Sequence, residues 1–138
     1  MARRSGTDSA EGLPLFQIGE VAERVGLSFR TIRHYDEVGV VVPSGRTEGG
    51  FRLYTDRDVE RLRKVMGMKP MGFALEEIRD VLDLLDALDE DPGAEGVRDR
   101  LQMYAALAVE RRDKYRRKLE LADDFTTMLQ GRVGLDPR

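Results

Sequence analysis

The stretch SFRTIRHYDEVGVVVPSGRTEGGFRLYTDRDVERL, residues 28–62, decides the fold of this chain. Ser28 is a favoured N-cap and predicts a helix that runs to about Val38. Just upstream, QIGEVAERVG places apolar side chains at 18, 21, 22 and 25, which is one stripe of a helix that Gly26 ends. The turn between the two helices is about three residues, so the pattern is typical of a helix-turn-helix.

A hairpin is expected after the second helix. Residues 40–42 and 51–54 are β-prone runs, and the glycine-rich loop PSGRTEGG joins them. The Gly49-Gly50 pair can adopt the positive φ of a tight turn. Two short strands joined in this way form a wing behind the helix-turn-helix.

More helices follow the hairpin. Thr55 and Asp58 resemble a capping box at the start of a third helix, which Pro70 stops. The leucine-rich pattern that follows predicts a fourth helix over about residues 75–88. Because helices dominate, we expect a mainly α fold with a winged helix-turn-helix and a helical pair.

The last predicted helix, residues 94–130, is long and carries an apolar seam. At 1.5 Å per residue it extends roughly 50 Å, too far to be buried against a domain this small. Steps of four and three from Leu101 reach nine positions, seven of them apolar, with Arg112 and Thr126 as exceptions. We expect the same helix of a second copy to cover the seam; a helix folded back on its own domain is the alternative. The expected dimerisation residues are Leu101, Ala105, Ala108, Tyr115, Leu119, Ala122 and Leu129.

The charge of the chain is unevenly distributed. Its 138 residues carry a formal net charge of −3, with 41% hydrophobic and 36% charged residues. Residues 30–69 hold nine Lys/Arg against six Asp/Glu, residues 71–91 one against eight, and residues 92–138 ten against eight. The acid is concentrated in one segment, so the net charge does not argue against a polyanionic partner. Ordinary solvated helix faces are the alternative explanation.

Several chemistries are missing from the sequence. It has no cysteine, which excludes disulfides, thiolate metal sites and thiol redox sensing, and His34 is its one histidine. We find no acid pair, nucleophile with a base, or phosphate loop, and therefore expect no enzyme, no metal and no cofactor. No apolar run approaches the roughly 20 residues that span a bilayer, and the N-terminus lacks a signal-peptide segment. We expect a cytoplasmic protein with no membrane partner.

The second predicted helix has the chemistry of a DNA reader. A helical wheel places Phe29 and Ile32 on one side and residues 30, 33, 34 and 37 on the other. Arginines that point outward from a short anchored helix can enter the major groove, where they bond guanine or clamp a phosphate. Hydroxyls at the helix N-terminus can bond phosphate too, and the wing adds two arginines. The expected DNA-binding residues are Ser28, Arg30, Thr31, Arg33, His34, Tyr35, Arg46 and Arg52.

These motifs, in this order, resemble the MerR family of bacterial transcription regulators over about residues 16–88. The resemblance lies in IGEVA at 18–22, TIRHYD at 31–36, GFRLY at 50–54, and GF with LEEI at 72–78. It implies a homodimer held by an antiparallel coiled coil. Such dimers bind an inverted repeat in a promoter with an overlong spacer and distort it so that RNA polymerase engages both promoter elements.

The resemblance also assigns roles and departures. It implies recognition-helix contacts from residues 30, 31, 33 and 35 and wing contacts from Arg46 and Arg52. His34 stands where the family often has Tyr or Phe. Ala74 replaces a hydroxyl residue that often caps the fourth helix, so we expect that cap to come from backbone or water.

The expected domain organisation has four parts. Residues 1–14 form a disordered leader, 15–90 the winged helix-turn-helix DNA-binding domain, 94–130 the coiled-coil dimerisation helix, and 131–138 a short tail. The leading hypothesis is a transcription regulator, and the alternatives are an architectural or excision-type DNA-bending protein and a coiled-coil interaction protein.

What the chain senses, and what its acidic segment does, are left open by the sequence. A small-molecule effector could bind between the long helix and the fourth helix, lined by Tyr104, Tyr115, Phe125 and methionines; otherwise abundance or a partner protein sets the activity. The acidic residues 76–91 are either a solvated face or a contact for a basic surface of a partner such as polymerase.

Overall fold

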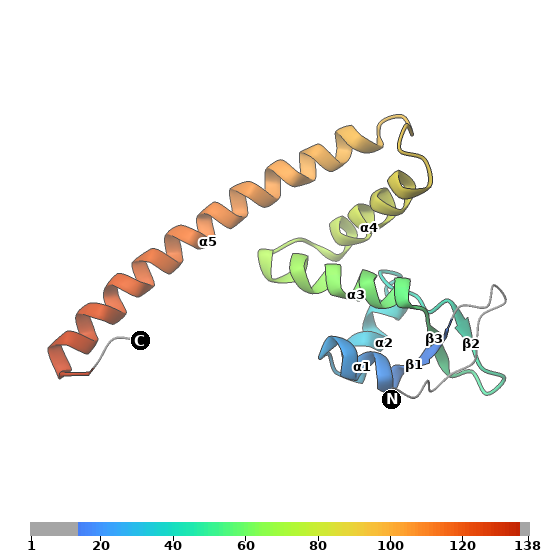
Figure 1. Ribbon diagram of the computed structural model, residues 1–138, viewed down its shortest axis with the longest axis horizontal. Helices are drawn as coiled ribbons and strands as arrows, with labels where there is room; N and C mark the ends of the chain where they lie inside the picture. Colours follow the sequence, from blue (N-terminus) through green and yellow to red (C-terminus); the bar gives the residue numbers. More distant parts are fainter. Residues whose placement is uncertain (1–13, 136–138) are drawn as a thin grey trace. The chain divides into compact units, whose positions relative to one another are not determined.

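The computed structural model describes residues 14–135, and the chain divides into two compact units, one up to Pro92 and one from Gly93. The elements of the first unit are β1 (Phe16–Gln17), α1 (Ile18–Val25), α2 (Phe29–Glu37), β2 (Gly45–Arg46), β3 (Arg52–Tyr54), α3 (Asp56–Met68), the 3-10 turn η1 (Lys69–Met71) and α4 (Leu75–Glu90). The second unit holds α5 (Val97–Val133). The expected mainly α fold with a winged helix-turn-helix and a long C-terminal helix is confirmed (Figure 1). The leader expected at 1–14 lies, apart from Pro14, outside the described residues, as do the last three residues of the expected tail.

The helix-turn-helix forms where its local signals place it. Gly26 ends α1 in the left-handed region at φ 73°, and its N–H donates to the Ala22 carbonyl at 2.8 Å. Ser28 begins α2, because its hydroxyl oxygen accepts from the Thr31 N–H at 3.1 Å. Only Leu27 lies between these two signals, which fixes the tight turn that the sequence predicts.

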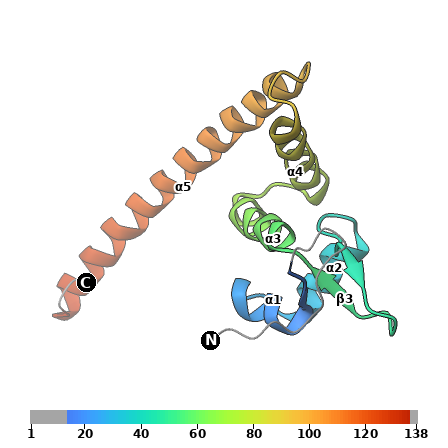
Figure 2. The same ribbon diagram turned by 45° about the vertical axis from the view of Figure 1, so that its right-hand side comes forward.

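A three-stranded antiparallel sheet with the order β1-β3-β2 forms the wing and ties it to the N-terminal end of the domain. Phe16 pairs with Tyr54, and Arg46 pairs with Arg52. Gly50 has φ 85°, and its N–H donates to the Thr47 carbonyl at 2.9 Å. This hydrogen bond closes the tip of the hairpin. The sequence did not predict β1, which is only two residues long and needs β3 as its partner. Figure 2 shows the central strand β3 beside α2 from a second direction.

The valine run at 40–42 is not a strand, and this prediction is wrong. Val40 and Val41 are buried, and both of their N–H groups donate to the Tyr35 carbonyl, at 2.9 and 3.2 Å. They close the turn after α2, so their backbone donors are used by the helix and not by a sheet. Pro43 then removes another donor. The first wing strand is therefore Gly45–Arg46.

The helical pair packs through a shared core with ionic edges. Ile32, Leu62, Ile78 and Leu82 are almost fully buried, and they join α2, α3 and α4. Around this core, Arg57 pairs with Asp86 at 3.0 Å. Arg61 also pairs with Asp86 and donates to the Val40 carbonyl at 3.2 Å. The core and these pairs hold α4 to the helix-turn-helix.

The capping box predicted for α3 is confirmed, and α4 has one half of such a box. The Thr55–Asp58 capping box forms: the Asp58 N–H donates to Thr55 Oγ1 at 3.2 Å, and the Thr55 N–H donates to Asp58 Oδ2 at 3.0 Å. At α4, the cap was expected from backbone or water. Glu77 Oε1 accepts from the Ala74 N–H at 2.9 Å, which satisfies the N–H of the N-cap residue. A hydroxyl at residue 74 would instead accept from an N–H of the first turn of α4, and Ala74 has no side chain to do so, so the cap expected there stays a prediction.

The second unit is dominated by one helix. α5 spans 37 residues, about 55 Å at 1.5 Å per residue, and Gly96 and Gly134 flank it with φ 78° and 76°. None of its residues is buried within the described chain, and several large apolar side chains, Leu119 and Phe125 among them, are more than half exposed. No helix among residues 14–135 is long and apolar enough to cross a membrane.

Candidate nucleic-acid interface

The outer face of α2 carries cations above a buried apolar face. Arg30, Arg33 and His34 are exposed, whereas Ile32 is fully buried and Tyr35 is 7% exposed. The sequence assigned the anchor to Phe29 with Ile32, and this is wrong for Phe29, which is 45% exposed. On the helical wheel Ile32 lies midway between residues 29 and 35, and the core covers the side of residue 35. α2 is therefore anchored by Ile32 and Tyr35.

Phe29 instead supports an arginine at the edge of the outer face. The Arg33 guanidinium lies 5.7 Å from the centroid of the Phe29 ring, within the range of a cation–π contact. The ring also lies beside Gly19 of α1, where an added Cβ would be in ordinary van der Waals contact with it at 3.8 Å. The cation–π contact restricts where Arg33 can point.

The N-terminus of α2 holds two hydroxyls in fixed positions. Ser28 Oγ lies 3.0 Å from Thr31 Oγ1 and accepts from the Thr31 N–H, so the cap and the hydroxyl pair form one unit. When Ser28 donates within this pair, the Thr31 hydroxyl keeps its own hydrogen for a phosphate oxygen. The Tyr35 ring is packed inside, and burial raises the pKa of its hydroxyl.

The wing arginines meet at a carboxylate of α2. Arg52 Nε lies 2.6 Å from Asp36 Oδ2, and Arg46 Nη2 lies 3.0 Å from the same oxygen. Arg46 Nη1 also donates to the Gly50 carbonyl at 3.1 Å. The hydrogen bond to Asp36 raises the pKa of Arg52 above its usual value. The structure thus brings the two predicted wing residues together, on an acid that the sequence analysis did not select.

The two groups of arginines differ in their ionic partners. Among residues 14–135, no acid forms an ion pair with Arg30 or Arg33, whereas Arg46 and Arg52 share Asp36. An unpaired guanidinium can bond a phosphate or a guanine without first leaving another partner. The α2 face is therefore the more readily available cationic surface, and the wing supplies a pre-organised one. Phe51 at the hairpin tip is 69% exposed, and the sequence analysis did not name it as a candidate DNA contact.

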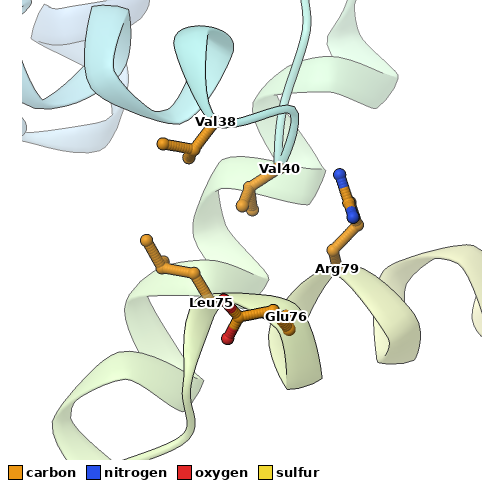
Figure 3. A pocket seen from close by; sticks show the side chains of 5 residues that line it. All are labelled: Val38, Val40, Leu75, Glu76 and Arg79. Carbon is orange, nitrogen blue, oxygen red and sulfur yellow. The ribbon is translucent and has the colours of Figure 1, made fainter.

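A small open pocket lies between the end of α2 and the first turn of α4 (Figure 3). Val38, Val40 and Leu75 give it an apolar floor, and Glu76 and Arg79 give it opposite charges at the rim. None of the aromatic residues expected to line an effector site belongs to it. Among residues 14–135, no group of three or more His, Asp or Glu side chains is arranged to hold a metal ion.

Comparisons with known proteins agree with this geometry. The family model described as "MerR HTH family regulatory protein" matches residues 16–85. The "HTH-type transcriptional activator mta" of Bacillus subtilis is 46% identical over 68 residues, which cover 49% of this chain and 26% of the relative. The "Nodulation protein NolA" of Bradyrhizobium elkanii is 32% identical over 125 residues, or 88% and 51% of the two chains. The chain thus spans between about a quarter and a half of the length of these curated relatives.

Solved structures give the same answer for the fold. The N-terminal part of the Bacillus subtilis multidrug transporter activator, MtaN, is similar with a TM-score of 0.53 and 31% identity, covering 86% of this chain and 97% of that one. HiNmlR, a MerR family regulator described as lacking the sensor domain and bound to promoter DNA, is similar with a TM-score of 0.68. At 23% identity, over 88% of this chain and 92% of that one, the second likeness concerns the fold alone.

Proposed function

The chain belongs to the MerR family, and on this premise we propose that it is a sequence-specific DNA-binding transcription regulator that acts as a homodimer on promoter DNA. The observation that carries the proposal is the outer face of α2, where Arg30 and Arg33 form no ion pair with any of residues 14–135 and lie above the buried Ile32 and Tyr35. A helix with this arrangement can lie in the major groove with its arginines against base edges or phosphates. Ser28, Thr31 and His34 extend the contact along the same helix.

The homodimer is proposed from α5. A helix of 37 residues with no buried side chain and a row of exposed apolar ones has little tertiary packing of its own. A second copy that packs along the seam from Leu101 to Leu129 would cover that row in an antiparallel coiled coil. A dimer with twofold symmetry presents two α2 helices and two wings, which matches an inverted repeat.

On a promoter with an overlong spacer, the proposed dimer bends and untwists the duplex so that RNA polymerase engages both promoter elements. Distorting a duplex costs several kcal/mol. Charge-assisted contacts from two recognition helices and two wings can offset that cost. HiNmlR, which shares the fold, is described as bound to promoter DNA, and this supports promoter DNA as the proposed partner.

The proposed protein is a cytoplasmic regulator and not an enzyme, with no cofactor or metal. Two inputs are compatible with it. One is a small-molecule effector in contact with Tyr104, Tyr115 and Phe125 of α5, and the other is control by abundance or by a partner protein.

Selection of bound genomic fragments, followed by footprinting and in vitro transcription, tests the proposal. We expect one family of sites with two inverted half-sites, and a change of initiation from a promoter that carries such a site. An architectural DNA-bending protein would bind and bend the same fragment and leave initiation unchanged. Failure to enrich any sequence would refute sequence-specific binding.

A further inference from the structure

The acid Asp36 links the recognition helix to the wing. We propose that Asp36 is a positioning residue that sets the specificity of DNA binding, by holding Arg46 and Arg52 against α2 so that helix and wing engage a duplex as one unit. The inference rests on the proposed DNA-binding function, to which it adds a residue that does not itself read the DNA.

The geometry of the cluster is the first support. One oxygen, Asp36 Oδ2, accepts from Arg52 Nε at 2.6 Å and from Arg46 Nη2 at 3.0 Å. The Asp36 side chain is only 11% exposed and that of Arg52 22%, so water screens this pair less than an ordinary surface ion pair. The Arg46 side chain is 48% exposed, and its guanidinium is also fixed by the Gly50 carbonyl. One carboxylate thus orients two guanidiniums that come from both strands of the hairpin.

The register of the wing is the second support. Arg46 and Arg52 are directly paired across the strands β2 and β3. Like charges at such positions destabilise a hairpin by their repulsion. Asp36 reaches them from the last turn of a different element and reduces the local charge from +2 to +1. The hairpin places two arginines opposite each other, and it therefore depends on the negative charge of Asp36. On DNA, a phosphate can take over this role from Asp36 or share it.

The contacts of Asp36 are expected to affect non-specific and specific DNA binding in opposite directions. Non-specific affinity rises with the number of cations that neutralise phosphates, so free wing arginines would favour any duplex. Specific affinity requires the wing contacts to keep α2 in register with the bases. Loss of Asp36 is thus expected to strengthen binding to arbitrary DNA and to weaken binding to the preferred site.

The test compares Asp36→Ala with Glu37→Ala in the full chain. Both variants lose one negative charge from the end of α2, but Glu37 is exposed, forms no ion pair with a described residue, and acts on Arg52 only through space and less than Asp36 does. The two probes are the duplex that the wild-type protein selects from a randomised library and a scrambled duplex of the same composition. Affinity for each is measured as a function of salt concentration.

For Asp36→Ala we expect the ratio of the two affinities to fall about tenfold, as for loss of a charge-assisted contact that fixes the wing. The salt slope on the scrambled duplex should steepen, by about one for each wing arginine that gains a phosphate. Asp36→Glu should restore most of the ratio, and Glu37→Ala should leave it near the wild-type value.

Two results would overturn the inference. A merely structural role for Asp36 would lower both affinities by the same factor and leave their ratio unchanged. An equal effect of Glu37→Ala would show that net charge, not the wing contact, is responsible. If Asp36→Ala is too unstable to assay, Asp36→Asn keeps the size and an acceptor oxygen and must still lower the ratio. A wild-type protein that selects no duplex at all would instead refute the proposed function.

Discussion

Replacing Leu119 by Asp in α5 should separate the two protomers, whereas the same change at Leu121 should not. The two leucines are similarly exposed in the single chain, at 60% and 70%. They differ in direction, because two residues along an α-helix turn the side chain by about 200°. Leu119 lies on the proposed dimer seam and Leu121 points away from it. The single chain alone gives no reason for different effects, so the contrast tests the coiled coil directly.

The expected magnitude follows from the exposed fraction of Leu119. Burying a whole leucine side chain stabilises by about 1.5–3 kcal/mol, and a twofold dimer contains two copies. Leu119 is 60% exposed in the single chain, and the partner helix would cover this part in the dimer. Leu119→Asp therefore removes roughly 2–4 kcal/mol from the free energy of dimer formation. At about 1.4 kcal/mol per factor of ten, the dimer dissociation constant rises roughly 30- to 700-fold. The desolvation of the new carboxylate adds to this.

Sedimentation equilibrium over a range of concentrations measures that constant, and circular dichroism on the same samples reports helicity. Dissociation should lower the helicity, because a lone α5 gains little from packing. Equal weakening by Leu121→Asp would refute the seam assignment, and a wild-type monomer at high concentration would refute the dimer itself.

Three further changes test other contacts. Asp58→Ala should lower the free energy of unfolding by roughly 2–3 kcal/mol, because Asp58 Oδ2 accepts from Ser44 and from the Thr55 N–H. Chemical denaturation measures this loss. Asp56→Ala, at an exposed position of the same turn, should lower the free energy of unfolding by less. Burial raises the pKa of Tyr54 from 10.0 to about 12, so the folded chain keeps a proton that the unfolded chain loses, and the free energy of unfolding should fall as pH rises from about 10 to about 12. Tyr54→Phe should remove that part of the fall, and an identical pH profile for the variant would contradict this account. Arg52→Ala should weaken binding to all duplexes and reduce the salt slope by about one, and an unchanged slope would argue against a phosphate contact from the wing.

The parts of the fold that sequence predicts best are those with signals inside one element. The caps at Ser28 and Thr55 each use a side chain and a backbone donor three residues apart, so the sequence contains both partners of the bond. Gly26 likewise ends α1 through a conformation that its lack of a side chain permits. Helix starts and stops were therefore predicted within a few residues.

The predictions that failed depended on partners far along the chain. β-branched residues at 40–42 favour a strand locally, but the Tyr35 carbonyl and the core take Val40 and Val41 into a turn. Phe29 and Tyr35 flank Ile32 equally on a helical wheel, and only the packing of the other elements decides which is buried. Local pattern does not contain that information.

The candidate site divides in the same way. The exposed cations of α2 follow from its amphipathic pattern, and the wing arginines follow from the hairpin. The acid that joins them does not, because Asp36 lies 10 residues from Arg46 and 16 from Arg52. A signal was present: an acid in the last turn of a recognition helix, followed by a hairpin with two arginines. Only the pairing register shows that the three meet.

The distribution of ion pairs, more than net charge, accounts for the DNA binding that we propose for an acidic chain. Part of the acid on α4 is used within the first unit, where Asp86 pairs with Arg57 and Arg61. That pairing holds α4 in place and neutralises cations on α3, where they would offer DNA a competing surface. Arg30 and Arg33 have no such partner among residues 14–135. The outer face of α2, the helix that we propose enters the groove, therefore keeps cations that no acid of the described residues neutralises.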